Sequence, residues 1–443
     1  NCRELAVRPA MSYWEAVQSV WTLFVILHME SNASSFSPGR MDRYLEPYYE
    51  KDVQSGALNP EEALEILECL WLKFNQIVYL RNRSSAKYFA GFPIGFNIVV
   101  GGQDEAGRPV YNAMTKLCLQ AQYDLGLPQP NLSVRLFSGT PHALMQDAIR
   151  VLARGSGMPQ FFNDEAVVHA LREDLGMAPA DALDYAVVGC VELCTPGREL
   201  GWSDAAMFNL CKALELALNH GVDLITKQQT GPDYGGLDTY GTYAQLEDSF
   251  RRMVDWYIGR MMAVENQVEQ AHQQYLPTAF LSAVIHDCME NGRDVVCGGA
   301  HYNFSGIQMI QVADLADSLA AVKELVYDTG MISRAELMAS LETDFEGHEV
   351  TRQMLLHKAP KYGNDVEWVD ALGARWAQYF RQRMKDYTNY RGGIYHTGMY
   401  TVSAHVPMGE NVGASPDGRK AGTPLADGGM SPAYGRDESG PTA

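Results

Sequence analysis

The chain has 443 residues, is 46% hydrophobic and 20% charged, and carries a formal net charge of −19. This composition is ordinary for a globular protein with a large core, and the acidic balance argues against nucleic acid as a partner, because phosphate binding needs clustered Lys and Arg. The eight cysteines are scattered without a CxxC pair, which favours a reducing cytoplasm and argues against a disulfide framework or a zinc site. The longest apolar run, residues 20–27, is too short to cross a bilayer, so no membrane segment is expected.

Helical segments dominate the first part of the chain. Apolar periodicity predicts helices at residues 12–28, 60–75, 111–125 and 141–154. Residues 91–102 predict a buried strand that ends in a glycine turn, and residues 132–136 predict another strand.

The rest of the chain repeats the order strand, then helix. Residues 185–188 predict a strand that leads to Cys190, and a loop then leads to a helix with Ser203 as N-cap and Gly221 as terminator. Further on, the patterns predict a strand at 303–312, a helix at 314–327 and a strand at 401–406. This order predicts an α/β fold with largely buried strands, and with no linker in sight the simplest interpretation is one large domain over residues 1–443.

The most informative short segment is Gly189-Cys190-Val191-Glu192. In an extended segment, residues i and i+2 point to the same side, so the Cys190 thiol and the Glu192 carboxylate are expected to face one pocket. Such a thiol can do nucleophilic or one-electron chemistry beside a base that moves a proton. A cysteine at a strand end is also a common space filler, and the spacing alone leaves both interpretations open.

This segment, followed by Gly-Trp-Ser-Asp-Ala-Ala-Met-Phe-Asn at residues 201–209, resembles the glycyl radical enzymes, the pyruvate formate-lyase-like superfamily. Other segments carry the same resemblance in family order along the whole chain: residues 30–32, 39–42, 47–49, 157–159, 163–165, 298–300, 302–304, 416–419, 424–428 and 440–443.

The resemblance implies a ten-stranded α/β barrel with Cys190 on a loop through its centre. It implies no bound cofactor or metal. Instead, a radical S-adenosylmethionine activating enzyme takes a hydrogen atom from a C-terminal glycine, and the glycyl radical converts Cys190 to a thiyl radical. The thiyl radical takes hydrogen from the substrate, and in the eliminases of this family Glu192 would be the base.

Two departures from the family pattern refine this expectation. Gly189 stands where pyruvate formate-lyase proper has a second cysteine, so the pattern resembles the dehydratase and lyase branch, which breaks C–O, C–N or C–S bonds of small polar substrates. The Arg-Val-x-Gly-Tyr pattern of the family's glycyl loop has no counterpart in these 443 residues. The chain is therefore expected to be an internal fragment without the N-terminal part and the glycyl radical domain, and to be inactive alone.

Five further residues match substrate-binding positions of the family. Asp204 matches an aspartate that binds substrate hydroxyls, although a carboxylate at a helix start is favourable anyway. Phe96 matches an aromatic pocket wall, and its alternative role is core packing. Ser34 and Ser35 fall where dehydratases bind polar groups, with Ser34 in place of a histidine of several relatives, and Thr401 matches a pocket position.

Other expectations concern partners and alternatives. Arg135 and His405 are candidate anion or proton partners, for which a structural role is the stronger interpretation. The expected partners are a small-molecule substrate, the activating enzyme and a second copy of the chain in a cytoplasmic homodimer. Two alternatives stay open: a formate C-acetyltransferase-like carbon–carbon lyase, and a non-catalytic barrel subunit.

Overall fold

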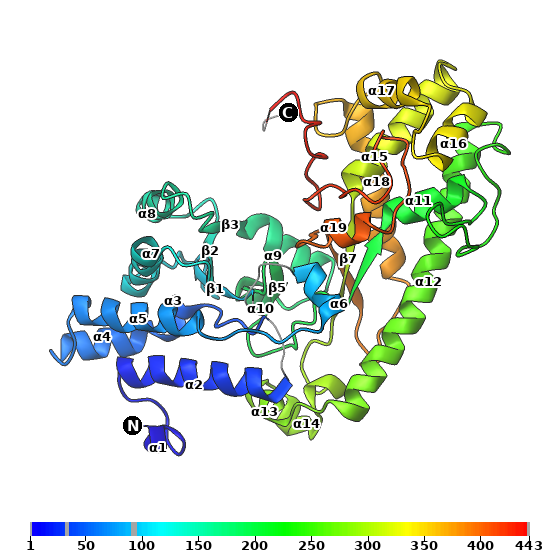
Figure 1. Cartoon of the computed structure of the whole chain (residues 1–443). Coiled ribbons are helices and arrows are strands. Elements are labelled where there is room, and N and C mark those ends of the chain that lie inside the picture. Colours follow the sequence, from blue (N-terminus) through cyan, green and yellow to red (C-terminus); the bar gives the residue numbers. More distant parts are fainter. Residues whose placement is uncertain (1, 32–34, 90–94, 441–443) are drawn as a thin grey trace. The chain divides into compact units, whose positions relative to one another are not determined.

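The computed structural model describes residues 2–31, 35–89 and 95–440, which form two compact units (Figure 1). The first unit comprises Asn1–Leu80, Gly91–Gly201 and His272–Asn303. The second comprises Arg81–Ala90, Trp202–Ala271 and Phe304–Ala443. Each unit is described here by itself, and one domain over residues 1–443 stays a prediction.

The first unit is built on a parallel sheet in the order β1-β2-β3, with β1 at Asn97–Gly101, β2 at Asn131–Leu136 and β3 at Gln160–Asn163. Helix α7 (Ala113–Leu125) connects β1 to β2, and α8 (His142–Leu152) connects β2 to β3. All five residues of β1 are buried, as the apolar run predicted, and β2 confirms the strand predicted at 132–136. Residues 91–94 of the predicted strand lie outside the described residues.

Two long helices pack side by side on this unit, α2 (Tyr13–Ser31) and α5 (Pro60–Phe74) (Figure 1). A capping box begins α5, because the Asn59 side chain accepts from the Glu62 N–H and the Glu62 side chain accepts from the Asn59 N–H. The four helices predicted in this part of the chain are confirmed, with ends that differ by at most three residues. The unit also contains α1 (Cys2–Leu5), α3 (Met41–Tyr44), α4 (Glu46–Gln54), α9 (Asp164–Glu173), α10 (Pro179–Leu183), α13 (Ala279–Val284), α14 (Cys288–Asn291) and η2 (Val295–Cys297).

The second unit has its own parallel sheet, ordered β6-β7-β8, with β6 at Ala206–Asn209, β7 at Ser305–Ile310 and β8 at Tyr395–Gly398. Helix α11 (Leu210–Leu218) follows β6, and α15 (Val312–Ala321) follows β7 and packs on α18 (Glu367–Met384). The predicted strand-helix unit at 303–327 is confirmed, and its helix continues as the π-helical turn η3 (Val322–Asp328). The other helices are α6 (Arg83–Ala86), η1 (Lys87–Phe89), α12 (Tyr243–Tyr275), α16 (Arg334–Glu342), α17 (Glu349–His357) and α19 (His405–Gly409).

Two predictions in this unit are wrong. Ser203 does not cap a helix: β6 comes first, and α11 begins at Leu210, where the Asn209 side chain accepts from the Lys212 N–H. Pairing of β6 with β7 overrides the helical periodicity here, so Asp204 precedes a strand and not a helix. Residues 401–406 are no strand either, because the Ala404 N–H donates to the Thr401 carbonyl in a turn that leads into α19.

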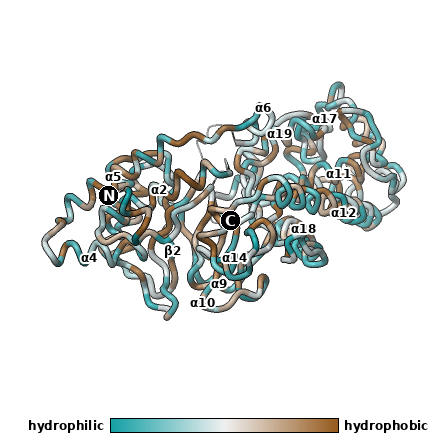
Figure 2. The backbone as a smooth tube through the Cα atoms, turned by 90° about the horizontal axis from the view of Figure 1, so that it is seen from below, coloured by the Kyte–Doolittle hydropathy of each residue, from teal (hydrophilic) through white to brown (hydrophobic). Residues whose placement is uncertain are grey.

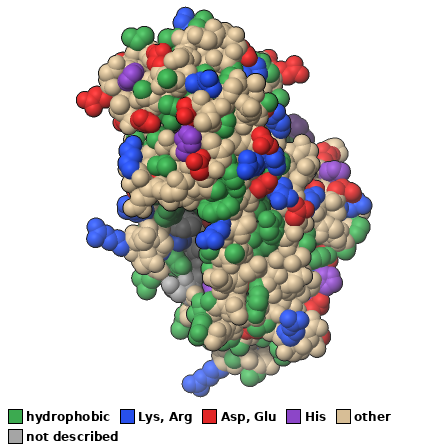
Figure 3. All heavy atoms as spheres, turned by 90° about the vertical axis from the view of Figure 1, so that its right-hand side faces the viewer, with side chains coloured by type: hydrophobic (Ala, Val, Ile, Leu, Met, Phe, Trp, Pro, Cys, Tyr) green, Lys and Arg blue, Asp and Glu red, His purple; other side chains and the backbone are tan. Residues whose placement is uncertain are grey.

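Among the described residues, no helix is long and apolar enough to cross a bilayer. Even α12, with 33 residues, mixes hydrophilic and hydrophobic residues along its length (Figure 2). Figure 3 shows Lys and Arg side chains interspersed with Asp and Glu over the face in view.

Two aspartates of α15, Asp314 and Asp317, are buried in the second unit. Burial raises the pKa of Asp317 to about 7, with Asp417 adding to the rise and Lys361 and Arg436 opposing it. Burial and the charge of Asp417 likewise raise the pKa of Asp314 to about 7. Asp317 Oδ1 accepts from the Tyr362 N–H at 2.7 Å.

Because the folded state keeps the Asp317 proton between about pH 4 and pH 7 while the unfolded chain releases it, stability is expected to fall as pH rises through that window. Asp317→Asn keeps an acceptor for Tyr362 but cannot ionise. The variant and the unsubstituted chain should differ more in free energy of unfolding as the pH rises. From about pH 5 to about pH 8, this difference should grow by about 2–3 kcal/mol in favour of the variant. Urea unfolding at both pH values tests this, and parallel pH slopes for the two proteins would contradict it.

Candidate active site

Cys190 lies at the tip of a β-hairpin. Strands β4 (Ala186–Val188) and β5 (Glu192–Cys194) are antiparallel, and Val188 pairs with Glu192, so residues 189–191 form the turn. The predicted extended strand, with thiol and carboxylate on one face, is therefore wrong, because a turn separates the two residues. The thiol residue is half-buried, as is Glu192.

The structure nevertheless brings the two residues together by another route. The Glu192 side chain folds back over the turn, and its Oε2 accepts from the Cys190 N–H and the Val191 N–H, each at 2.7 Å. Gly189 makes room for this carboxylate: its φ is +65°, and a Cβ there would lie 2.8 Å from Glu192 Oε1. The Gly-Cys-Val-Glu sequence is thus one structural unit, in which glycine admits the carboxylate that organises the cysteine backbone.

Two residues outside the hairpin also bind its turn, and sequence analysis did not identify either. Ser37 Oγ accepts from the Gly189 N–H at 3.1 Å and from the Asn97 N–H at 2.9 Å. Asn97 Nδ2 donates to the Cys190 carbonyl at 3.2 Å. Both residues lie close to predicted substrate-binding residues, since Ser37 follows Ser35 by two positions and Asn97 follows Phe96 directly. That closeness is the one signal that the sequence offers for them.

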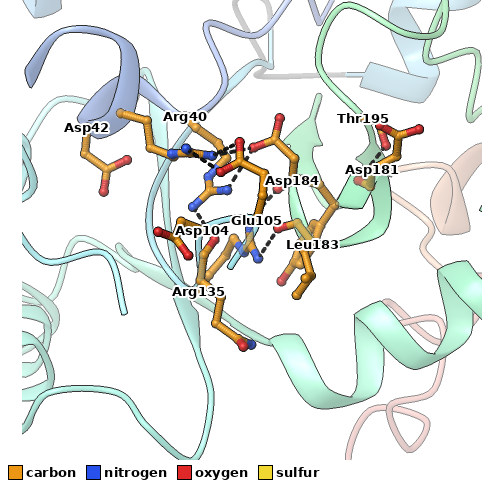
Figure 4. Close-up of polar contacts among 12 residues, drawn as sticks. Arg40, Asp42, Asp104, Glu105, Arg135, Asp181, Leu183, Asp184 and Thr195 are labelled. Carbon is orange, nitrogen blue, oxygen red and sulfur yellow. Dashed lines mark hydrogen bonds and ion pairs between the residues drawn. The ribbon is translucent and has the colours of Figure 1, made fainter. Parts of the chain in front are cut away.

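Charged side chains hold the segment that leads into the hairpin (Figure 4). Arg40 is buried, and it donates to Asp184 at 2.9 Å and to the carbonyls of Gly101 and Gln103 at 3.2 and 2.8 Å. Arg43 contacts the same Asp184 oxygen at 3.0 Å. These bonds tie Asp184, two residues before β4, to the end of β1.

Arg135 anchors the same segment from β2. It is fully buried and donates to both carboxylate oxygens of Asp164 at 2.8 and 2.9 Å. It also donates to the carbonyls of Tyr185 and Leu183 at 2.8 and 2.9 Å, and its guanidinium lies 3.9 Å from the centre of the Tyr185 ring. Every one of these contacts is structural, which confirms the stronger of the two interpretations of Arg135.

The other predicted site residues are distributed over both units. Phe96 is fully buried in an aromatic cluster, with ring centres 4.9 Å from Phe24 and 5.0 Å from Phe74, and its role as a pocket wall stays a prediction. Ser35 has a φ of +80°, and its carbonyl accepts from Ser37 Oγ. Ser34 lies outside the described residues.

Asp204 and Thr401 belong to the second unit. Asp204 is half-buried just before β6. Thr401 is buried and its Oγ1 donates to the Asp427 carbonyl at 2.5 Å. Across the described part of the chain, no group of three or more His, Cys, Asp or Glu side chains is arranged to hold a metal ion.

Comparison with known proteins places this fold and hairpin in a family. The family model described as "Pyruvate formate lyase-like" matches residues 1–409. The chain is 38% identical over 460 residues to the probable dehydratase YbiW of Escherichia coli K12, covering 100% of this chain and 56% of the relative. It is 34% identical over 449 residues to (2S)-3-sulfopropanediol dehydratase of Klebsiella oxytoca, covering 100% and 54%.

Solved structures agree. The glycerol-bound glycerol dehydratase from Clostridium butyricum matches with a TM-score of 0.94 and 38% identity, covering 98% of this chain and 54% of that one. Hydroxyproline dehydratase from Clostridioides difficile matches with a TM-score of 0.94 and 32% identity, covering 99% and 56%.

The chain belongs to the pyruvate formate lyase-like family. Within it, the chain groups with the dehydratase branch of the glycyl radical enzymes, and its α/β fold is part of their barrel, which confirms the predicted fold class. The chain spans about half the length of the curated relatives that it matches.

Proposed function

We propose that the protein to which this chain corresponds is a glycyl radical eliminase, a dehydratase or lyase that breaks a C–O, C–N or C–S bond of a small polar substrate. The observation that carries the proposal is the Cys190 turn, where a carboxylate is folded against the backbone of a half-buried cysteine. The relatives support it, since they include proteins named as dehydratases and as a sulfite-lyase.

The proposed chemistry uses Cys190 for the hydrogen atom and Glu192 for the proton. Cys190 gives its thiol hydrogen to a glycyl radical and, as a thiyl radical, takes a hydrogen atom from a substrate carbon. Glu192 accepts the proton of the hydroxyl on that carbon while the group on the neighbouring carbon leaves with its electron pair. The product radical finally takes the hydrogen atom back from Cys190, which restores the thiyl radical.

The remaining roles belong to the same proposal. Asp204, Ser34, Ser35 and Thr401 would bind polar groups of the substrate, and Phe96 would form an apolar wall. A radical S-adenosylmethionine activating enzyme would generate the glycyl radical, on a glycine of the whole protein, and the enzyme would act as a cytoplasmic homodimer. Exclusion of water would protect the radical intermediates.

Cys190→Ala tests the proposal in the whole protein after anaerobic activation. Turnover is expected to be abolished, while the glycyl radical EPR signal persists because the activating enzyme does not need the thiol. Cys194→Ala is the matched control, since Cys194 lies on β5 of the same hairpin, and it should keep turnover. Retained activity in Cys190→Ala, measured by product formation on a panel of small alcohols, would rule the mechanism out.

A further inference from the structure

We propose that Ser37 and Asn97 are positioning residues. They hold the Cys190 turn at a fixed position relative to the β1-β2-β3 sheet, as hydrogen-atom transfer requires. The inference rests on the proposed function and extends it to two residues that do not touch the reacting atoms. It is carried by the hydrogen bonds of the turn, the burial of Asn97 and the positions of both residues outside the hairpin.

The turn presents backbone groups that strand pairing does not organise. Glu192 accepts two of its N–H groups, those of Cys190 and Val191, but Glu192 belongs to the hairpin itself. These internal bonds shape the turn without fixing where it lies. The two strands of this hairpin have only three residues each. Without contacts to other segments, its tip could move relative to the rest of the unit.

Ser37 makes one set of the contacts that fix the position of the turn. Its Oγ donates to the Ser35 carbonyl at 2.9 Å and accepts from the N–H groups of Asn97 and Gly189 at 2.9 and 3.1 Å. One hydroxyl therefore joins three segments: the segment before α3, the start of β1 and the first residue of the turn. A hydroxyl can serve as donor once and acceptor twice, so this oxygen is fully used.

Asn97 makes the other contact that fixes the position of the turn. It is the first residue of β1 and has no exposed surface. Its Nδ2 donates to the Cys190 carbonyl at 3.2 Å and to Gln160 Oε1 of β3 at 3.4 Å. The carbonyl of the cysteine itself is thus attached to the parallel sheet through one buried amide.

This attachment matters because hydrogen-atom transfer requires close approach of the donor and acceptor atoms. Cys190 Sγ must meet a glycine carbon and then a substrate carbon, and a misplacement of about 1 Å can cost about 100-fold in rate. Loss of the hydrogen bonds that Ser37 or Asn97 makes to the turn leaves Glu192 and the thiol in place. The tip of the hairpin, however, can then move. The cost should therefore fall on the rate of transfer and not on substrate affinity.

The test uses Ser37→Ala and Asn97→Ala in the whole activated protein, at equal glycyl radical content by EPR. Each should lower kcat about 10- to 100-fold with KM changed less than about threefold. Ser37→Thr keeps the hydroxyl and should restore kcat to within about threefold of the unsubstituted enzyme. Ser282→Ala is the matched control: Ser282 is a buried serine of α13 in the same unit, whose Oγ donates to the Thr278 carbonyl at 2.7 Å and accepts from the Val295 N–H at 2.9 Å, away from the turn, and kcat should be unchanged.

A second measurement reads the Cys190–glycine contact without substrate. In D2O the thiol exchanges its hydrogen with solvent, so reversible transfer between thiol and glycine replaces the hydrogen on the glycine carbon and collapses its EPR splitting. Ser37→Ala and Asn97→Ala should slow this collapse by about the factor lost in kcat. Ser37→Thr and Ser282→Ala should keep the rate of collapse within about threefold of that of the unsubstituted enzyme.

The inference is overturned if Ser37→Ala and Asn97→Ala both exchange and turn over within about threefold of the unsubstituted enzyme. It is also overturned if Ser282→Ala loses as much kcat, because the effect would then come from the core and not from the turn. Failure of the proposed function looks different: deuterium would enter at the same rate with and without the Cys190 thiol.

Discussion

Replacing Arg135 with methionine is expected to lower the free energy of unfolding of the first unit by about 3–5 kcal/mol. Arg135 and Asp164 are both fully buried, so the variant leaves the Asp164 carboxylate in the core without its cation. It also removes the donor from the carbonyls of Leu183 and Tyr185 just before the hairpin. Hydrogen exchange of the β2 amides measures the loss within this unit.

Two comparisons separate the buried charge from the loss of an arginine side chain. Arg150→Met removes an arginine of the same unit that bonds Gln120 at the surface, and should change stability by less than about 0.5 kcal/mol. Arg135→Met combined with Asp164→Asn removes both charges and should recover part of the loss. A loss of less than about 1 kcal/mol in Arg135→Met alone would show that the ion pair does not hold this part of the sheet together.

Gly189→Ala is expected to have the largest effect on activity among substitutions that leave Cys190 and Glu192 in place. The new Cβ would lie 2.8–3.0 Å from the atoms of the Glu192 carboxyl group, so the carboxylate must move and give up its bonds to the Cys190 and Val191 N–H groups. Displacing a base by about 1 Å costs about 100-fold. Steady-state kinetics of the activated whole protein should therefore show kcat reduced about 100-fold or more.

Gly176→Ala is the matched control for this substitution. Gly176 has nearly the same backbone conformation, with φ at +67° against +65°, but a Cβ there meets nothing within 4 Å. Both alanines carry the strain of a left-handed backbone, about 1 kcal/mol, and only the one at position 189 displaces a carboxylate. Equal kcat values for the two variants would mean that the carboxylate position does not matter to the reaction.

The local pattern of apolar and polar residues was enough to predict many of the helices and strands. The helices α2, α5, α7 and α8 follow from apolar periodicity. Strand β1 follows from an apolar run that ends in a glycine turn, and β2 and β7 follow from short segments in which apolar residues are mixed with polar ones. The pattern failed at β6 because a partner distant in sequence decided: β6 is a strand since it pairs with β7, which lies about a hundred positions further along. At residues 401–406 it failed because a local turn leads into α19.

The sequence by itself determined the family, the fold class and the pair of residues on which the proposed chemistry depends, because motifs in order along the whole chain carry that information. Only the tertiary structure decided how Cys190 and Glu192 meet, through a turn with the carboxylate folded back over it and not through one face of a strand. It alone also revealed Ser37 and Asn97, which bind the turn from 152 and 93 positions away. The physical reason is that the turn's backbone N–H and C=O groups must be satisfied, and the fold chooses which distant side chains satisfy them.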